Sequence, residues 1–276
     1  VPPFVAVVIL LARLLMDFGY KLGLVDQPNE RSSHTKIVPR VGGLAIFLPY
    51  LVLGLAFYLT GYDNLQLNSG YWIGLGAIVA LGTLDDRLDL SSTLKFLIQF
   101  AVAAYYVLST GNYVDNLYGL FGIGALPSWL GISLSIITVV YLINAVNLID
   151  GVDGLAAGIC LLALYLFSTL MGGGEYLITS IFIGLGLIVF MGFNYSNKRK
   201  IFLGDAGSLS LGFIIATFAM EFLHSGNAHH LHLNLNPVIV AILVLGYPVA
   251  DTIRVFAIRI SMGLSPFNAD RRHMHH

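Results

Sequence analysis

The segment Asn144-Ala-Val-Asn-Leu-Ile-Asp-Gly-Val-Asp-Gly-Leu155 closes a long run, residues 129–146, that carries no charged side chain. Asn144, Asn147 and Asp150 recur at every third position, which places them within about a half-turn arc of one helix face. The glycines of the two Asp-Gly pairs that follow would end the helix and let the backbone approach a ligand closely. The stretch predicts an apolar helix whose polar end forms a site at a membrane surface. A helix cap followed by an ordinary Asp-Gly turn is the simpler alternative.

The composition outside this stretch is that of a membrane protein. Of 276 residues, 57% are hydrophobic and 11% are charged, whereas soluble domains carry roughly 25% charged residues. We therefore expect one all-α, polytopic transmembrane domain over residues 1–276, since no linker separates a soluble part. The single cysteine, Cys160, excludes a disulfide within the chain. We expect about nine apolar spans, at residues 1–16, 41–60, 71–84, 94–110, 129–149, 155–172, 176–195, 206–223 and 237–258.

The basic residues give these spans an orientation. All 14 Lys and Arg fall on one side if the nine spans alternate, and the opposite connections hold none. The positive-inside rule then makes the basic side cytoplasmic and places the N-terminus outside. The net charge of −1 gives no indication of a nucleic-acid partner. The sequence thus predicts a multi-pass protein with its functional groups on the cytoplasmic face.

The third apolar segment ends in a second acidic motif, Asp85-Asp86-Arg-Leu-Asp89. Adjacent carboxylates repel each other unless a cation or a proton lies between them. Oxygen ligands of this kind select Mg²⁺ or Mn²⁺ over softer metals. The motif favours metal or phosphate chemistry over the alternative, a solvated helix end with Arg87 as its counter-ion.

Two glycine-containing segments suggest anion binding by the backbone. Gly42-Gly43, which follows Pro39-Arg40, would leave N–H groups accessible at the start of a helix, although a flexible helix entry explains it equally well. Gly204-Asp205-Ala-Gly-Ser208 follows a basic cluster at 198–200 and is predicted to cradle a metal-bound phosphate. A helix N-cap by Asp205 is the alternative for the second segment.

Basic and imidazole side chains at the same face could bind phosphates. Lys95 opens the fourth apolar segment, where a lysine is usually an interfacial anchor but could also hold a phosphate as a point charge. Three histidines close the chain, and their imidazoles could donate hydrogen bonds to a pyrophosphate or ligate a metal: His273, His275 and His276.

Together these motifs resemble the polyprenyl-phosphate N-acetylhexosamine-1-phosphate transferase family (glycosyltransferase family 4). The forms Pro-Arg-Val-Gly-Gly and Asp-Arg-x-His-x-His-His are more similar to its WecA/TagO branch than to MraY. The matching motifs occur in family order: Pro39-Arg-x-Gly-Gly43, Asp85-Asp86-x-x-Asp89, Asn144-x-x-Asn147-x-x-Asp150-Gly-x-Asp153-Gly-Leu155, Phe202-x-Gly-Asp205-x-Gly-Ser208 and His273-x-His275-His276.

The resemblance implies a reaction. Undecaprenyl phosphate would attack the β-phosphorus of a UDP-N-acetylhexosamine, most simply UDP-GlcNAc, and UMP would leave. The product would be the lipid-linked sugar pyrophosphate that initiates a cell-surface glycan such as lipopolysaccharide or teichoic acid. Mg²⁺ or Mn²⁺ would be the cofactor, the site would face the cytoplasm at the bacterial inner membrane, and a homodimer is one assembly that the family allows.

The resemblance also implies roles for individual residues. The catalytic groups would be Asp85, Asp86, Asp205 and His273, and the metal ligands would come from Asp85, Asp86, Asp150 and Asp205. The substrate-binding residues would be His34, Arg40, Lys95, Asn144, Asn147, Asp150, Asp153, Arg259, His275 and His276.

The extent of the protein and its function each leave something open. Members of this branch continue past the histidine motif with further spans, to a total of ten or eleven, so we expect C-terminal spans beyond those seen here. A MraY-type phospho-MurNAc-pentapeptide transferase is an alternative function. A lipid transporter or flippase is an alternative from another class, but transporters usually place ionisable residues near the bilayer midplane.

Overall fold

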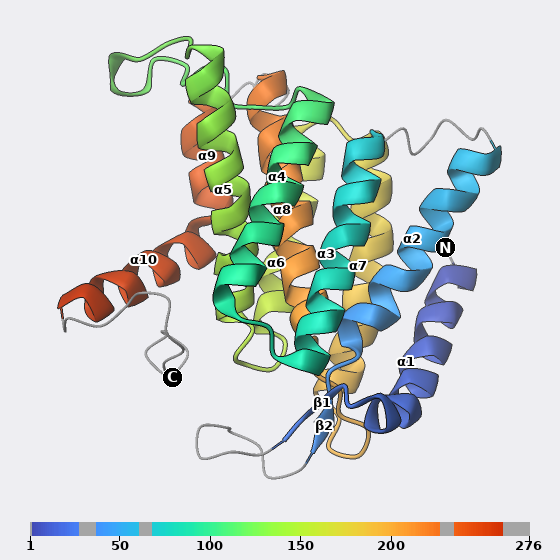
Figure 1. Cartoon of the computed structure of the whole chain (residues 1–276). Helices are drawn as coiled ribbons and strands as arrows, with labels where there is room; N and C mark the ends of the chain where they lie inside the picture. Colours follow the sequence, from blue (N-terminus) through green and yellow to red (C-terminus); the bar gives the residue numbers. More distant parts are fainter. Residues whose placement is uncertain (1, 28–36, 61–67, 227–234, 262–276) are drawn as a thin grey trace.

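The computed structural model describes residues 2–27, 37–60, 68–226 and 235–261, which form a helical bundle with one short two-stranded sheet (Figure 1). The sheet pairs Val25–Asp26 (β1) with Val38–Pro39 (β2) in antiparallel fashion. The described helices are α1 (Pro2–Leu22), α2 (Gly42–Thr60), α3 (Ser69–Leu88), α4 (Ser92–Thr110), the one-turn η2 (Leu120–Gly122), α5 (Ser128–Ile149), α6 (Leu155–Leu170), α7 (Glu175–Asn194), α8 (Asp205–Ser225), α9 (Pro237–Val244) and α10 (Gly246–Ser261).

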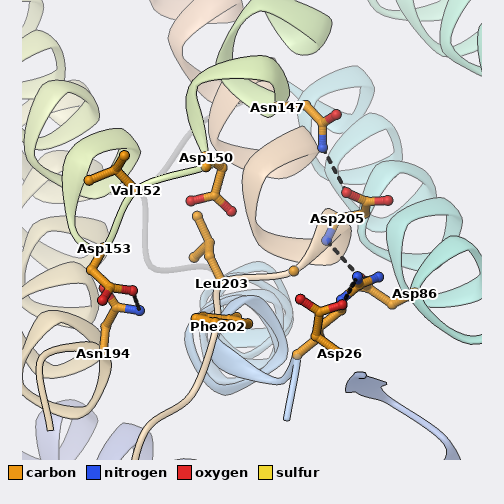
Figure 2. A pocket seen from close by; sticks show the side chains of 13 residues that line it. Asp26, Asp86, Asn147, Asp150, Val152, Asp153, Asn194, Phe202, Leu203 and Asp205 are labelled. Atoms are coloured by element: carbon orange, nitrogen blue, oxygen red, sulfur yellow. Dashed lines mark hydrogen bonds and ion pairs between the residues drawn. The ribbon is translucent and has the colours of Figure 1, made fainter. Parts of the chain in front are cut away.

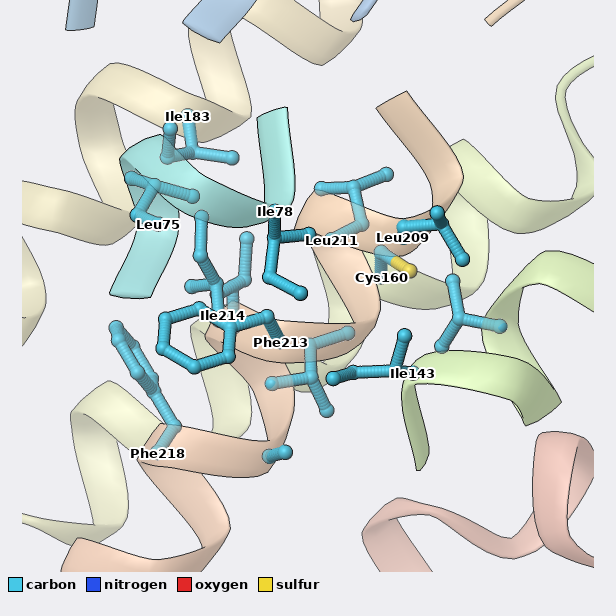
Figure 3. Packing of buried hydrophobic residues seen from close by; sticks show 14 of the residues in the cluster. Leu75, Ile78, Ile143, Cys160, Ile183, Leu209, Leu211, Phe213, Ile214 and Phe218 are labelled. Carbon is cyan, nitrogen blue, oxygen red and sulfur yellow. The ribbon is translucent and has the colours of Figure 1, made fainter. Parts of the chain in front are cut away.

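Helix α8 is the centre of the bundle. Of its most apolar 18 residues, 94% are buried, against 22% for α1 at the edge. It packs on α5, α3, α2 and α6, and its Phe213, Ile214 and Phe218 lie among apolar side chains of the surrounding helices (Figure 3). Small residues allow the close approach: a Cβ on Gly212 would lie 2.6 Å from the Cα of Ile143.

The length and polarity of the helices confirm the predicted helical membrane bundle. Among the described helices, six are long and apolar enough to cross a bilayer: α1, α2, α4, α5, α7 and α8. The bent pair α9 and α10 could provide a seventh span, while α3 and α6 complete the bundle. Eight of the nine predicted apolar segments coincide with one helix each. How many of them cross the membrane stays a prediction.

The ninth predicted segment, residues 237–258, is not one continuous helix. It consists of α9 and α10, which meet at an angle of 75°. Pro248 explains the break, because it has no N–H to donate to the carbonyl of Val244, four residues earlier, where α9 ends. Figure 1 shows α10 leaving the bundle sideways. This bend places α10 against α5, beside the polar end of the bundle.

The motif-bearing helix ends meet at one end of the bundle. The C-terminal ends of α3, α5 and α7 lie there, with the N-terminal ends of α2, α4, α6 and α8 and with the β1–β2 hairpin (Figure 1). The hairpin is attached to the segment before α8, since Phe202 donates to Pro39 and Gly42 donates back to Phe202. The basic residues 87, 95 and 198–200 flank these ends, as the orientation prediction requires.

Candidate functional site

A polar cavity of about 360 Å³, here called the acidic cavity, opens at this end of the bundle (Figure 2). It lies where α5, α7, α8 and the β1–β2 hairpin converge. Asp153 and Asn194 lie on one side of it, Asp205 and Asp86 on the other, and Asp150 between them (Figure 2). The carboxylates that line it are Asp26, Asp86, Asp150, Asp153 and Asp205.

Asp86 caps the N-terminus of α8. One of its oxygens accepts the N–H of Asp205 and the other accepts that of Ala206, each at 3.0 Å. A carboxylate is favourable there because the first N–H groups of a helix have no partner within it. These donors are therefore occupied by Asp86, and the prediction that the Gly204–Ser208 backbone cradles a phosphate is wrong for them.

Asn147 connects α5 to the same turn. Its amide nitrogen donates to Asp205 at 2.7 Å and to the hydroxyl of Ser208 at 2.8 Å. Asn147 on α5 thus binds the Asp205 carboxylate, while Asp86 on α3 binds the Asp205 backbone N–H, so two neighbouring helices hold this residue. Three motifs that lie far apart in the sequence thus meet at the first turn of α8.

The Gly42-Gly43 pair is neither an anion site nor a flexible entry. Its two N–H groups donate to the carbonyls of Phe202 and Leu203, at 2.9 and 2.8 Å. A Cβ on Gly43 would lie 2.2 Å from the backbone nitrogen of Gly207, so only glycine allows this contact. The pair therefore attaches α2 to the segment that carries Asp205, and both interpretations of the sequence are corrected.

Arg40 lies at the rim of the acidic cavity. Its guanidinium pairs with Asp26 at 2.5 Å and lies 3.9 Å from Asp86. Asp26 ends β1 and Arg40 directly follows β2, so the paired strands hold the Arg40 guanidinium beside the carboxylates of the cavity. Asp26 was not among the predicted site residues, because nothing in the sequence shows that Val25 pairs with Pro39.

The concentration of carboxylates makes the cavity suited to a cation. Withdrawal from bulk water, followed by repulsion from neighbouring carboxylates, raises the pKa of the Asp150 carboxyl well above its ordinary value. Within the described residues, no three side chains of the usual ligand types lie close enough to hold a metal ion by themselves. Mg²⁺ is commonly bound by one or two carboxylates plus water and substrate phosphates, so the donor chemistry fits although the ligand shell would need a substrate.

The other side of the acidic cavity carries an amide and an aromatic ring. Asp153 pairs with Lys200 and accepts a hydrogen bond from Asn194 at 3.3 Å. The side-chain oxygen of Asn194 is buried and has no partner among the described residues. Phe202 lines the cavity, with the Lys200 ammonium 5.5 Å from its ring centroid. A buried acceptor beside a flat ring is a suitable place for a planar ligand with an N–H group.

A second cavity of about 330 Å³, here called the Lys95 cavity, lies on the far side of Asn147. Asp85 faces this cavity, not the acidic one. Its oxygens accept the N–H of Leu90 at 2.9 Å and the ammonium of Lys95 at 2.7 Å. Arg259 of α10 also lines the cavity, with 2% of its surface exposed. Two cations, Lys95 and Arg259, thus line the cavity with two carboxylates, Asp85 and Asp89, and Lys95 is more than an interfacial anchor because it pairs with Asp85.

An apolar pocket of about 470 Å³ adjoins the Lys95 cavity. The two share five lining residues, and the pocket continues between α4, α5 and α10. The shared residues are Ser92, Phe96, Asn144, Leu148 and Phe256.

The predicted ladder on α5 spans both cavities. Asn144 lines the Lys95 cavity, Asn147 lines both, and Asp150 lines the acidic cavity. Each step of three residues turns about 60° short of a full circle, so the ladder rotates from one cavity toward the other. Residues that seemed to form one face therefore serve two adjacent cavities.

The structure brings most of the predicted site residues to the same end of the bundle, in two adjacent cavities. The acidic cavity holds Asp86, Asp150, Asp153, Asp205 and Arg40. The Lys95 cavity holds Asp85, Lys95, Asn144 and Arg259. The predicted residues His34, His273, His275 and His276 lie outside the described residues. The sequence prediction missed Asp26, Gln99, Asn194 and Phe256, which line the cavities. Gln99 could have been found, because it lies four residues after Lys95 and therefore on the same helix face.

Comparison with known proteins is consistent with this geometry. Residues 69–223 match the family model described as glycosyl transferase family 4. The chain is 36% identical to the probable undecaprenyl-phosphate N-acetylglucosaminyl 1-phosphate transferase of Bacillus subtilis (strain 168), over 98% of the chain and 73% of that protein. It is 31% and 30% identical to the undecaprenyl-phosphate alpha-N-acetylglucosaminyl 1-phosphate transferases of Yersinia pestis and Escherichia coli (strain K12), over 93% of the chain and 69% of each protein. The chain therefore belongs to glycosyl transferase family 4.

Proposed function

We propose that this membrane protein transfers N-acetylglucosamine 1-phosphate from UDP-GlcNAc to undecaprenyl phosphate. An oxygen of the lipid phosphate forms a bond to the β-phosphorus of the nucleotide sugar, and the bond from that phosphorus to the bridging oxygen breaks. UMP leaves with the bridging oxygen, and the product is a lipid-linked sugar pyrophosphate. The proposal rests on one observation: two polar cavities, one of them continuous with an apolar pocket, meet at Asn147.

The acidic cavity fits the nucleotide sugar. The diphosphate would lie beside Asp205 and Asp86, and the uridine would extend toward Phe202 and Asn194. The free oxygen of Asn194 could accept the N–H of uracil, and the ring of Phe202 offers a stacking face.

The Lys95 cavity fits the lipid phosphate. Lys95 and Arg259 provide positive charge for a phosphate, and the adjoining apolar pocket offers room for the start of a prenyl chain. Asp85 holds Lys95 in place and lies next to Asp205, so the attacking oxygen would enter beside the acidic cavity. These residues would contribute mainly by positioning two reactants that repel each other.

We propose Mg²⁺ or Mn²⁺ as the cofactor, held by Asp205 and Asp150 together with the donor's phosphate oxygens. When bound, the ion would offset the repulsion between the reactants and stabilise the leaving UMP. Asp86 is better suited to hold the first turn of α8, since both of its oxygens already accept backbone N–H groups. Asp85 is better suited to orient Lys95 than to bind the metal.

We further propose that the site faces the cytoplasm of a bacterial cell at the inner membrane. Lys and Arg residues gather at the end of the bundle that carries both cavities, which matches the positive-inside rule. A cytoplasmic site would also have access to a soluble nucleotide sugar, while the apolar pocket would remain in contact with the lipid phase.

The test is UMP release by the purified protein from UDP-GlcNAc, with undecaprenyl phosphate and Mg²⁺ each omitted in turn. We expect release only when all three are present, and slower release from UDP-GalNAc and UDP-MurNAc-pentapeptide. Asp205→Asn should lower the rate by roughly two to three orders of magnitude, because it removes a carboxylate proposed to hold the metal ion at the reacting diphosphate. Asp17→Asn, at an exposed position on α1, is the matched control and should retain full activity. Full activity of Asp205→Asn, or no UMP from any of the three donors, would contradict the proposal.

A further inference from the structure

Gln99 is a buried amide at the wall of the Lys95 cavity. It lies on α4 one turn after Lys95, on the same helix face, and only 1% of its surface is exposed. Glutamine is seldom buried to this extent unless its polar atoms have partners. Its neighbour across the helix interface is Asn144 of α5, at a distance of 2.6 Å between the Gln99 oxygen and the Asn144 nitrogen.

The hydrogen bonds of Asn144 fix which way the Gln99 amide faces. The Asn144 nitrogen also donates to the carbonyl of Val140 at 2.8 Å. A carbonyl can only accept, so the Asn144 amide must present its nitrogen on that side. The Gln99 amide must then present its oxygen to Asn144, and its nitrogen with two N–H groups is turned away from Asn144. Within the described part of the chain, no hydrogen bond occupies that nitrogen.

The surroundings of this amide indicate what it would bind. Lys95 and Arg259 line the same cavity and attract an anion. Asp85 and Asp89 line it too, and their negative charges limit how strongly the cavity attracts that anion. A neutral amide can add hydrogen-bond donors to a bound anion without adding further charge. The apolar pocket that shares Asn144 and Phe96 with this cavity limits the anion to the head of an apolar molecule, or to a free phosphate that resembles it.

We propose that Gln99 donates a hydrogen bond from its side-chain nitrogen to a phosphate oxygen of the lipid acceptor. Asn144 is the positioning residue, because it fixes the orientation of the Gln99 amide and touches no reacting atom. The inference rests on the proposed function and assigns its acceptor side a residue outside the motifs of the sequence. It separates acceptor recognition from donor recognition, because Gln99 does not line the acidic cavity.

The experiment compares Gln99→Glu and Gln99→Met with the wild-type protein. Glu keeps the shape but replaces the donors by a negative charge, and Met keeps the length without any donor. We expect the KM for undecaprenyl phosphate to rise about tenfold in Gln99→Met and further in Gln99→Glu, because a hydrogen bond to a charged group is lost. The KM for UDP-GlcNAc should stay within about twofold of the wild-type value. Gln27→Glu, at an exposed position after β1, is the matched control for the added charge and should change neither KM.

Asn144→Ala tests the positioning role. Without Asn144 the Gln99 amide can rotate, so we expect the acceptor KM to rise while binding of UDP, measured by calorimetry, is retained. Retained UDP binding shows that each variant is folded, and Gln99→Met carries the test if Gln99→Glu fails this check.

An unchanged acceptor KM in Gln99→Met, or an equal rise in both KM values, would overturn the inference. The addition of inorganic phosphate distinguishes the two sources of the anion: inhibition competitive with undecaprenyl phosphate and weakened in Gln99→Met supports the assignment. If the wild-type protein releases no UMP at all, the proposed function fails first and independently of Gln99.

Discussion

The acidic cavity and the Lys95 cavity share Asn147 but have opposite chemistry. The acidic cavity is lined by five carboxylates and one guanidinium. The Lys95 cavity has two cations, Lys95 and Arg259, and adjoins an apolar pocket. Both proposed reactants are anions, and the Lys95 cavity sets two cations against the two carboxylates of Asp85 and Asp89, whereas the acidic cavity sets one guanidinium against five carboxylates. The difference indicates that one anion would arrive with a divalent cation, whereas the other would be bound by the protein's side chains.

A second comparison is between residues that hold the backbone of the site in place and residues whose side chains face a substrate. Asp86 and Gly43 bind backbone groups, so they fix the first turn of α8. Asp150 and Asn194 line the acidic cavity, and the Asp150 carboxylate points into it (Figure 2). Substitutions of the first kind should lower stability and activity together, whereas substitutions of the second kind should change activity alone.

The largest effect should come from removing divalent cations. Chelation with EDTA should abolish UMP release, because the uncompensated carboxylates of the acidic cavity would repel a diphosphate. Mg²⁺ or Mn²⁺ should restore the rate, and UMP release measured against added metal checks this. Substantial activity in excess EDTA would mean that the acidic cavity binds its ligand without a metal.

The next largest effect should be confined to the Lys95 cavity. Lys95→Met should raise the KM for undecaprenyl phosphate roughly 10- to 100-fold, since it removes a charge and leaves buried Asp85 unpaired. The KM for UDP-GlcNAc should change little. Lys198→Met, in the exposed turn before α8, is the control. Steady-state kinetics with each substrate varied in turn would detect an equal change in both KM values, which would contradict the separation of the cavities.

The smallest of the three effects should be confined to the acidic cavity. Phe202→Leu should raise the KM for UDP-GlcNAc about tenfold, because a base stacked on an aromatic ring loses that contact. The KM for undecaprenyl phosphate should not move. Phe121→Leu, at an exposed position in the connection between α4 and α5, is the matched control. A donor KM unaffected by Phe202→Leu would remove the ring from the proposed uridine site.

The sequence predicted features that depend on local order along the chain. Uncharged runs predicted the helices, and the clusters at Asp85, Asn147 and Asp205 predicted where polar groups gather, because amphipathic periodicity and charge are read from neighbouring residues. It could not show that Gly43 would bind the carbonyl of Leu203, or that Asp86 would occupy the N–H groups of α8. Those contacts join segments more than 100 residues apart, and spacing alone does not specify them.

The bend between α9 and α10 is a different case, because its cause was present in the sequence. Gly246 and Pro248 interrupt an apolar run that was long enough to be interpreted as one span. The interruption has consequences for the site, since α10 carries Arg259 and Phe256 into the Lys95 cavity.

Photo-crosslinking tests most directly whether the two reactants occupy separate cavities that meet at Asn147. A polyprenyl phosphate carrying a diazirine next to its phosphate would be activated on the purified protein, and the adducts would be located by mass spectrometry. We predict adducts on α4, α5 and α10, at residues such as Phe96 and Phe256, that persist when UDP saturates the protein. Adducts at Val152 or Leu203 in the acidic cavity, or adducts that UDP abolishes, would contradict the two-cavity account.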